Sequence, residues 1–261
     1  MRWWGKLIGG AFGYMLGGPL GAVLGVVLGH QLDKAFANIM LDPEFGSGKV
    51  ERVQQAFFTA TFSVMGHLAK ADGRVTSDEI AVASHVMAQM QLNEEQRKVA
   101  INLFNQGKQP EFQLDATLEQ FRRECHRRHN LIHMFLEILI STAIADGKVD
   151  SAEHELLLHV SAVMGISAGA FEQLLRMVGA QQAYHQQGHS PQIRIKEAYD
   201  ILGVEQDVSD AELKKAYRRL MNQHHPDKLV AKGLPEEMMK IATEKTQEIK
   251  QAYEHIKESR K

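Results

Sequence analysis

Residues 213–228 read L-K-K-A-Y-R-R-L-M-N-Q-H-H-P-D-K and contain a helix pattern followed by a helix breaker. Pro226 cannot continue a helix, and it restricts the backbone of the residue before it, so the chain must turn at His225. We therefore predict a helix that runs to about His224 and a loop that presents His225 and Asp227. The apolar residues that would pack this helix recur at spacings of three and four, at Leu213, Ala216 and Leu220.

The rest of this helix is basic, and a second helix pattern follows it. Ser209 and Glu212 have the spacing of a capping box at its start. A shorter helix precedes it and ends at Gly203. The basic face carries Lys214, Lys215, Arg218 and Arg219. From about Pro235 the apolar positions of a further helix are Met238, Ala242, Ile249, Ala252, Tyr253 and Ile256. The pattern predicts two antiparallel helices that pack through their apolar faces.

Four ordered motifs of this region resemble the J domain of the DnaJ co-chaperones over about residues 195–257. They are Y-D-I-L-G-V at 199–204, A-Y-R-R-L at 216–220, H-P-D-K at 225–228 and E-I-K-Q-A-Y-E at 248–254. The resemblance implies that the tripeptide stimulates ATP hydrolysis by a DnaK-type chaperone, whose acidic surface receives the basic helix. It implies no cofactor on this chain. The implied partner-binding residues are His225, Pro226, Asp227, Lys214, Tyr217, Arg218, Arg219 and Lys228.

The sequence departs from this family pattern after the tripeptide. Residues 229–235 read L-V-A-K-G-L-P where the common short Asn-Pro turn is expected. The usual fourth helix is absent or vestigial, and there is neither a Gly/Phe-rich segment nor a Cys-x-x-Cys repeat. General holding of unfolded clients is therefore not implied.

The composition excludes several other classes of protein. The chain has 261 residues, with 30 Lys and Arg against 32 Asp and Glu. A net charge of −2 gives no global attraction to nucleic acid, and we expect no nucleic-acid partner. Cys125 is the single cysteine, so the fold has no internal disulfide and suits a reducing compartment. Residues that favour helix dominate, so we predict an all-α protein.

The first 32 residues follow different rules and predict a transmembrane helix. Lys6 and Asp33 enclose 26 residues without formal charge, more than the roughly 20 that cross a bilayer. Trp3 and Trp4 precede this stretch as interfacial anchors. Glycines recur every fourth residue, so they form one stripe on which a second helix can pack, and we expect a homodimer. The stripe comprises Gly5, Gly9, Gly13, Gly17, Gly21, Gly25 and Gly29. A cleaved signal peptide and a flexible tail are the alternatives.

After a linker at 33–49, a duplicated helical domain is predicted over residues 50–180. A shift of 74 residues aligns ten identities, including A-D-G-x-V turns at 71–75 and 145–149. Each copy reads as a helical hairpin, with Thr76 and Glu79 or Asp150 and Glu153 capping its second helix. The less favourable His154 occupies the staple position of the second copy, which predicts a less well fixed turn. The facing apolar sets are Phe58, Phe62 and Met65 in one copy and Ile132, Leu136 and Leu139 in the other.

These paired turns resemble the TerB-like (tellurite-resistance) helical family. Members of that family have acidic residues near the turns, which makes Asp72, Glu79, Asp146 and Glu153 candidate metal ligands. Helix capping explains these acids more simply, so no metal is expected. His126, His129 and His133 would share one side of a continuous helix as a zinc site, but Arg122, Arg123, Arg127 and Arg128 would repel a cation.

A polar stretch at 181–192 predicts a flexible linker before the last domain, residues 193–261. Together the segments resemble membrane-anchored bacterial DnaJ-like proteins. We expect a co-chaperone without enzymatic activity, anchored in the inner membrane by one span. Its amino terminus would be periplasmic and its bulk cytoplasmic, where the chaperone and ATP reside. The partners would be a DnaK-type chaperone, membrane lipid and a second copy. Alternatives are a structural membrane scaffold and a metal-dependent hydrolase that uses the acidic turns.

Overall fold

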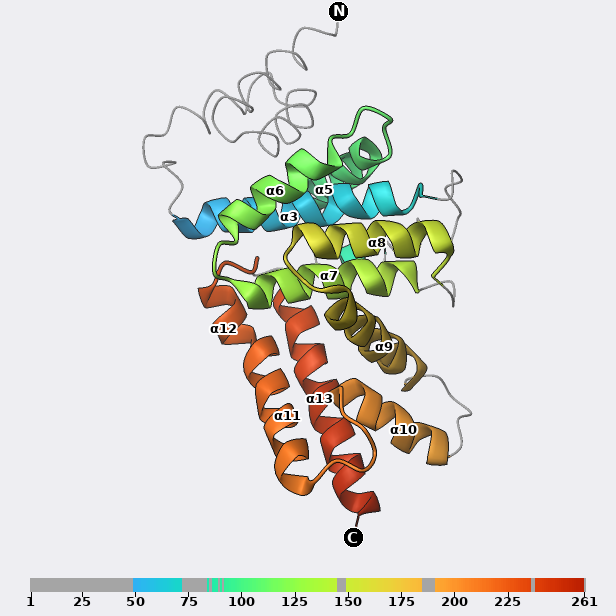
Figure 1. Ribbon diagram of the computed structural model, residues 1–261. Coiled ribbons are helices and arrows are strands. Elements are labelled where there is room, and N and C mark those ends of the chain that lie inside the picture. The colour runs from blue at the N-terminus through green and yellow to red at the C-terminus, as the bar shows by residue number, and fades with distance from the viewer. Residues whose placement is uncertain are drawn as a thin grey trace, which may run out of the picture.

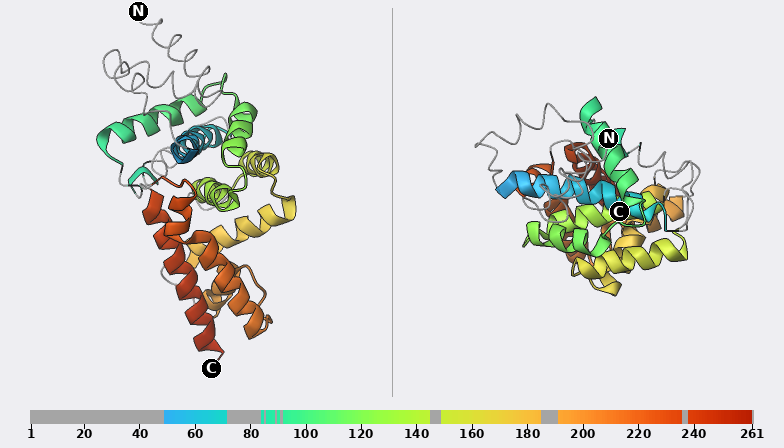
Figure 2. Two further views of the ribbon diagram at one scale, coloured as in Figure 1. Left: turned by 90° about the vertical axis from the view of Figure 1, so that its left-hand side faces the viewer. Right: turned by 90° about the horizontal axis from the view of Figure 1, so that it is seen from above.

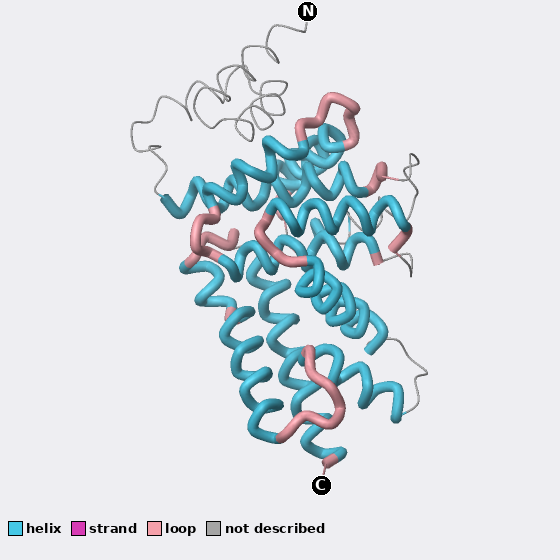
Figure 3. The backbone as a smooth tube through the Cα atoms, viewed as in Figure 1, coloured by secondary structure: helices cyan, strands magenta, loops and turns pink. Residues whose placement is uncertain are grey.

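The computed structural model describes residues 49–71, 84, 86–88, 90, 92–144, 149–184, 191–235 and 238–260. Every regular element in these ranges is a helix and none is a strand, which confirms the all-α prediction (Figure 3). The predicted membrane segment with its glycine stripe and positions 33–48 of the linker lie outside the described residues. No helix within those ranges has both the length and the apolar composition that a membrane span requires.

The described helices of the middle domain surround α3. They are α3 (Lys49–Leu68), α5 (Glu94–Gly107), α6 (Leu114–Glu124), α7 (His129–Ala143), α8 (Ser151–Val163) and α9 (Ala168–Tyr184). Helix α3 packs against α5, α6 and α7, while α9 leads away toward the last domain (Figures 1 and 2). The predicted pairing of two apolar faces is thereby formed between α3 and α7.

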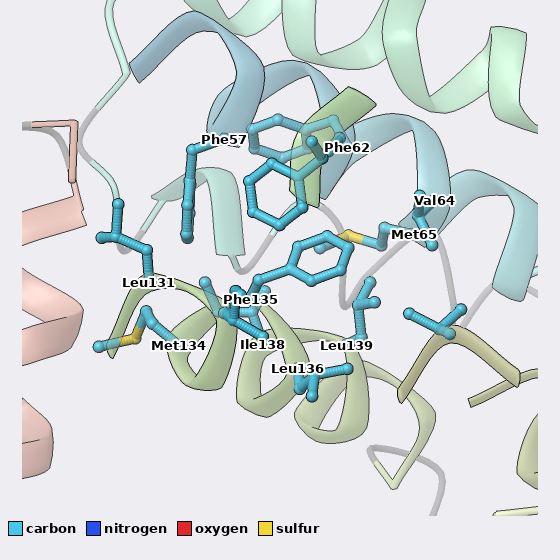
Figure 4. Close-up of a cluster of buried hydrophobic side chains, with 14 of the residues drawn as sticks. Phe57, Phe62, Val64, Met65, Leu131, Met134, Phe135, Leu136, Ile138 and Leu139 are labelled. Carbon is cyan, nitrogen blue, oxygen red and sulfur yellow. The ribbon is translucent and has the colours of Figure 1, made fainter. Parts of the chain in front are cut away.

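The centre of this domain is a dry cluster of large side chains (Figure 4). Phe62 and Met65 of α3 are fully buried with Leu136 and Leu139 of α7, as the sequence predicts, whereas Phe58 is half-buried. The aromatic ring pairs Phe57–Phe121, Phe57–Phe135 and Phe121–Phe135 have centroid distances of 5.9, 6.5 and 4.7 Å. Burial of such side chains contributes about 1.5–3 kcal/mol each, which makes this cluster the main source of stability.

The turn before α8 has the predicted capping box. The Glu153 N–H donates to Asp150 Oδ1 at 2.8 Å, and the Asp150 N–H donates to Glu153 Oε2 at 3.0 Å. The turn residues 145–148, for which the sequence predicts weaker fixing, lie outside the described residues. At the start of α8 itself, His154 bonds to α9. Its Nε2 lies 2.8 Å from Glu172 Oε1, and its ring packs on Phe171. The acidic positions Asp72, Glu79 and Asp146 lie outside the described residues.

The chain breaks between α6 and α7, where the sequence was read as one continuous helix. Cys125 caps α6, and Arg127 has a φ of 61°, in the left-handed region that no α-helix tolerates. His126 is therefore in the turn, whereas His129 and His133 are in α7. Because the helix is interrupted between His126 and His129, the predicted placement of these three imidazoles on one helix face is wrong.

The last domain is built from α10 (Pro191–Leu202), α11 (Asp210–His224), α12 (Pro226–Ala231) and α13 (Met239–Ser259). The Ser209–Glu212 capping box is present, and Gly203, with a φ of +64°, ends α10 as predicted. Three boundaries differ from prediction. A short helix replaces the loop after His225, α13 begins later than Pro235, and α9 and α10 extend into both ends of the predicted linker 181–192.

The last domain packs directly on the middle domain instead of standing apart from it. Helix α10 lies along α9, and the end of α11 reaches α7 (Figure 1). The segment after the tripeptide joins the middle-domain core, with Leu229, Leu234 and Met238 fully buried there. Gly233 has a φ of +99° and lies so close to α3 that a Cβ would be 2.8 Å from Val53 Cγ1. The unusual L-V-A-K-G-L-P sequence is therefore the element that docks one domain on the other.

Candidate functional site

The corner, residues His225–Asp227, joins α11 to α12. His225 ends α11 and precedes α12 with φ −59° and ψ 122°, the extended conformation that a following proline requires. Pro226 then occupies the first turn of α12, where its missing N–H costs nothing. Two helices of different direction thus meet at a rigid junction.

Both polar side chains of the corner face solvent. His225 and Asp227 are exposed and Pro226 is half-buried. The His225 side chain makes no capping hydrogen bond to α12, so its imidazole is free to meet another molecule. Underneath, the Leu229 N–H donates to the His225 carbonyl at 3.0 Å, and the Leu229 side chain is fully buried. The buried Leu229 therefore anchors the corner to the core, while the side chains of His225 and Asp227 stay accessible to solvent.

Helix α11 presents the predicted basic face. Lys214, Arg218 and Arg219 are exposed, and none of them has an ion pair or hydrogen bond with the residues that the structure describes. Leu213, Ala216 and Leu220 are buried on the opposite side, as predicted. Unpaired cations on one rigid face attract an acidic surface and set its orientation.

The other two sequence-predicted residues have partners within the domain. Tyr217 is half-buried, and its ring stacks on Tyr253 of α13 with centroids 4.3 Å apart. Lys228 is exposed, and its Nζ bonds to Asn222 Oδ1 across the corner. Tyr217 therefore uses the face of its ring to hold α11 on α13.

A buried ionic cluster directly beneath the corner was not found from the sequence. It consists of Glu137, His224 and Lys245, from α7, α11 and α13. The Glu137 carboxylate oxygens lie 3.4 Å from His224 Nε2 and 3.4 Å from Lys245 Nζ. The side chains of Glu137 and His224 are each 4% exposed, so this cluster is shielded from water. The signal that could have revealed it is a lone glutamate in the apolar run M-F-L-E-I-L-I at 134–140.

The cluster has opposite effects on its two titrating members. Burial alone would raise the pKa of the Glu137 carboxyl, but the basic groups that face it, Lys245 above all while His224 is neutral, hold that pKa below its usual value, so the carboxylate stays ionised. Burial lowers the pKa of His224 and outweighs the facing carboxylate, so the imidazole is neutral at pH 7. His224 Nδ1 has no hydrogen-bond partner among the described residues. The stable form is a carboxylate–ammonium pair beside a neutral imidazole.

Of the four candidate metal ligands, the structure describes only Glu153. Glu153 bonds to Asp150 in the capping box, and no three His, Cys, Asp or Glu side chains converge within the described ranges. Cys125 is buried, which raises the pKa of its thiol to about 12. It is therefore a neutral packing residue.

Comparison with known proteins matches three family models in order along the chain. Residues 1–50 match the co-chaperone DjlA transmembrane domain, residues 58–176 match tellurite resistance protein TerB, and residues 197–261 match the DnaJ domain. These three models cover, in order, the regions whose sequence predicts a membrane segment, a TerB-like helical domain and a J domain.

The chain is also similar over its full length to curated proteins named "Co-chaperone protein DjlA". The protein of Shewanella oneidensis is 44% identical, covering 100% of this chain and 99% of the relative. That of Coxiella burnetii is 43% identical with the same coverage, and that of Salmonella typhimurium is 45% identical, also at 100% and 99%. No solved structure matches the chain.

Proposed function

The chain belongs to the DjlA family of membrane-anchored co-chaperones, and from this premise we propose that its J domain stimulates ATP hydrolysis by a DnaK-type chaperone. The observation that carries the proposal is the corner, where an exposed imidazole and carboxylate stand at the end of an exposed basic helix. The site residues would be His225, Pro226 and Asp227 with Lys214, Tyr217, Arg218, Arg219 and Lys228.

The basic face of α11 supports the first step of this function. Its unpaired cations speed the encounter with an acidic partner and fix the register of the complex. Because these cations are exposed, each one alone contributes little to the binding affinity, and the attraction comes from their sum.

The corner would then favour one state of the partner. A ligand shifts a conformational equilibrium only by the difference in its affinity for the two states. His225 and Asp227 would make their contacts only with the form of the chaperone that is competent for hydrolysis. This chain would supply no reacting group, since the nucleotide and its chemistry belong to the partner.

The test is the ATP turnover of a DnaK-type chaperone with the full chain in detergent micelles. The full chain should accelerate turnover, and His225→Gln should abolish the acceleration without changing the thermal unfolding temperature. Glu155→Gln, an exposed carboxylate substitution on α8, should behave as the unchanged chain. Stimulation by His225→Gln equal to that of the unchanged chain would refute the role of the tripeptide.

The same function supports a topology. ATP and its chaperone are cytoplasmic, so residues 33–261 would lie in the cytoplasm, with a single span and a short periplasmic amino terminus. Tethering of this kind raises the effective concentration of a co-chaperone near membrane clients. A reporter fused to the carboxyl end should be active only on the cytoplasmic side, and periplasmic activity would contradict the topology.

We also propose that the glycine stripe joins two copies within the lipid. The support is its spacing, since glycine at every fourth position permits close approach of helix backbones. Gly17→Leu should reduce crosslinking between copies in the membrane, and unchanged crosslinking would refute the dimer. The same lipid-embedded helix would make the anchor's contacts with membrane lipid.

A further inference from the structure

The corner is held to the middle domain by more than its apolar underside. Asn130, at the start of α7, donates from Nδ2 to the Gln223 carbonyl at 2.8 Å, and its Oδ1 accepts from Lys232 Nζ at 3.1 Å. These two bonds attach the last turn of α11 and the end of α12 to the same residue of the middle domain. The corner lies between those two attachments.

The buried ionic cluster makes the deeper attachment. His224 is the last residue of α11 and directly precedes the corner, while Lys245 is on α13. Glu137 contacts both from α7, and Lys245 also bonds to Gln181 Oε1 of α9. One carboxylate of the middle domain therefore connects two helices of the last domain on opposite sides of the corner.

If the two domains moved independently, the Glu137 carboxylate would lose its contacts with His224 and Lys245. A carboxylate in an apolar helix is costly to bury unless it is paired, and among the described residues its two ion-pair contacts, His224 and Lys245, both belong to the last domain. If the last domain left its seat, Glu137 and the middle-domain apolar surface would have to be solvated. The arrangement is consistent only with a last domain that is seated in one orientation.

We propose that Glu137 is a positioning residue for the chaperone interface, acting through His224 and Lys245 to fix the corner in one orientation on the middle domain. This inference rests on the proposed function of the J domain. A corner fixed in advance pays no ordering entropy when the chaperone binds. It also holds the tripeptide in one place relative to Lys49. Lys49 is the first described residue after the predicted membrane anchor and linker.

The expected effect of losing Glu137 follows from population arithmetic. When only a fraction of the molecules is in the binding-competent state, the apparent affinity of the protein for its partner falls in proportion to that fraction. If Glu137→Gln leaves the Lys245 ammonium without a counter-charge and reduces the seated population to about a tenth, the half-stimulating concentration rises about tenfold. The maximal stimulation stays as it was, because the complex that finally forms has the same tripeptide contacts.

Two measurements on the full chain in micelles test this. The first is the dependence of chaperone ATP turnover on the concentration of the chain. The second is the distance distribution between spin labels on Glu119→Cys in α6 and Glu258→Cys in α13, both exposed and distant from the cluster. The buried Cys125, with its pKa raised to about 12, has little reactive thiolate, so the labels attach selectively.

The unchanged chain and the control Glu155→Gln should give one narrow distance distribution. Glu137→Gln should broaden it and raise the half-stimulating concentration about tenfold at constant maximum. Glu137→Gln combined with Lys245→Met removes both buried charges and should restore the narrow distribution, because an ion pair replaced as a whole costs little. Asn130→Ala, at a half-buried position, should also broaden the distance distribution and raise the half-stimulating concentration, each by a smaller factor. This variant tests the proposal if Glu137→Gln does not fold.

Several results would overturn the inference. An unchanged distance distribution in both Glu137→Gln and Asn130→Ala would show that these residues do not seat the domain. A broadened distribution with unchanged or increased stimulation would show that seating does not serve the interface. Failure of the proposed function itself looks different, because His225→Gln would then stimulate normally while its distances stay narrow.

Discussion

At the scale of single residues, the molecule depends on backbone conformations that its neighbours impose. His225 is extended because proline follows it, and this alone turns the chain at the corner. Gly233 is left-handed and lies against α3, where no side chain fits. The extended backbone of His225 follows from the dipeptide His225–Pro226 alone, whereas the close approach of Gly233 to α3 exists only because two domains pack together.

Gly233→Ala should therefore destabilise the chain. A Cβ there would be 2.8 Å from Val53 Cγ1 on a backbone with a φ of +99°. We expect a loss of about 1–3 kcal/mol in the free energy of unfolding, measured by urea denaturation. The control is Gly169→Ala in α9, where a Cβ would meet nothing within 4 Å, and helix propensity predicts a gain of about 0.5–1 kcal/mol. Equal effects of the two substitutions would contradict the close approach.

At the scale of elements, α11 is divided between packing and recognition. Its apolar face is buried on α13, and the Tyr217–Tyr253 stack holds the two helices in register. Its basic face is exposed along the helix up to the corner. The amphipathic pattern thus serves both stability and partner binding, because helical periodicity separates the two sets of side chains.

Reversal of one charge on that face should weaken partner binding without unfolding the domain. Lys214→Glu should raise the half-stimulating concentration in the ATP turnover assay about three- to tenfold and reduce its dependence on salt. The matched control is Lys98→Glu on α5, which reverses an exposed charge of the middle domain. If both variants respond alike, the effect reflects net charge, and α11 is not the docking face.

At the scale of the whole molecule, the two helical domains pack together with a buried ionic contact between them. The titratable and charged groups at this contact are His133 and Glu137 of α7, His224 of α11 and Lys245 of α13. The exposed cation Arg219 of α11 and His129 of α7 also lower the pKa of His133. Burial lowers the pKa of both His133 and His224 below 6.5. Both imidazoles are therefore neutral in the seated state.

Acidification should loosen the seating of the last domain. A histidine whose pKa is lower in the folded state stabilises that state above pH 6.5, and this contribution is lost as the pH falls through the lowered values. The pKa of Glu137 is also lowered, so its own contribution is lost only below pH 4.5. The spin-label distances should broaden reversibly between pH 7.5 and 5.5. His224→Asn should reduce this pH dependence. A distance distribution of the unchanged chain that is the same at pH 5.5 as at pH 7.5 would contradict the prediction that acidification loosens the seating.

Local rules determined much of the architecture from the sequence alone. Helical periodicity and capping boxes predicted α8 and α11, because those signals act within a few residues of each other. The 74-residue repeat predicted the α3–α7 pairing, because two similar hairpins can bury their apolar faces against each other. The Pro226 restriction predicted the corner and the exposure of His225. The ordered motifs indicated the family, since each preserves a helix face or a turn.

Only the tertiary structure decided how the domains meet. Polar residues predicted a flexible linker at 181–192, yet α9 and α10 extend into it because each has an apolar surface to pack on the other. The sequence around Leu229, Val230 and Leu234 predicts an irregular loop, and its role depends on a core formed by residues 53–178. Glu137 and His224 are 87 residues apart, and their pairing depends on the long-range packing of α7 against α11, which local pattern does not encode.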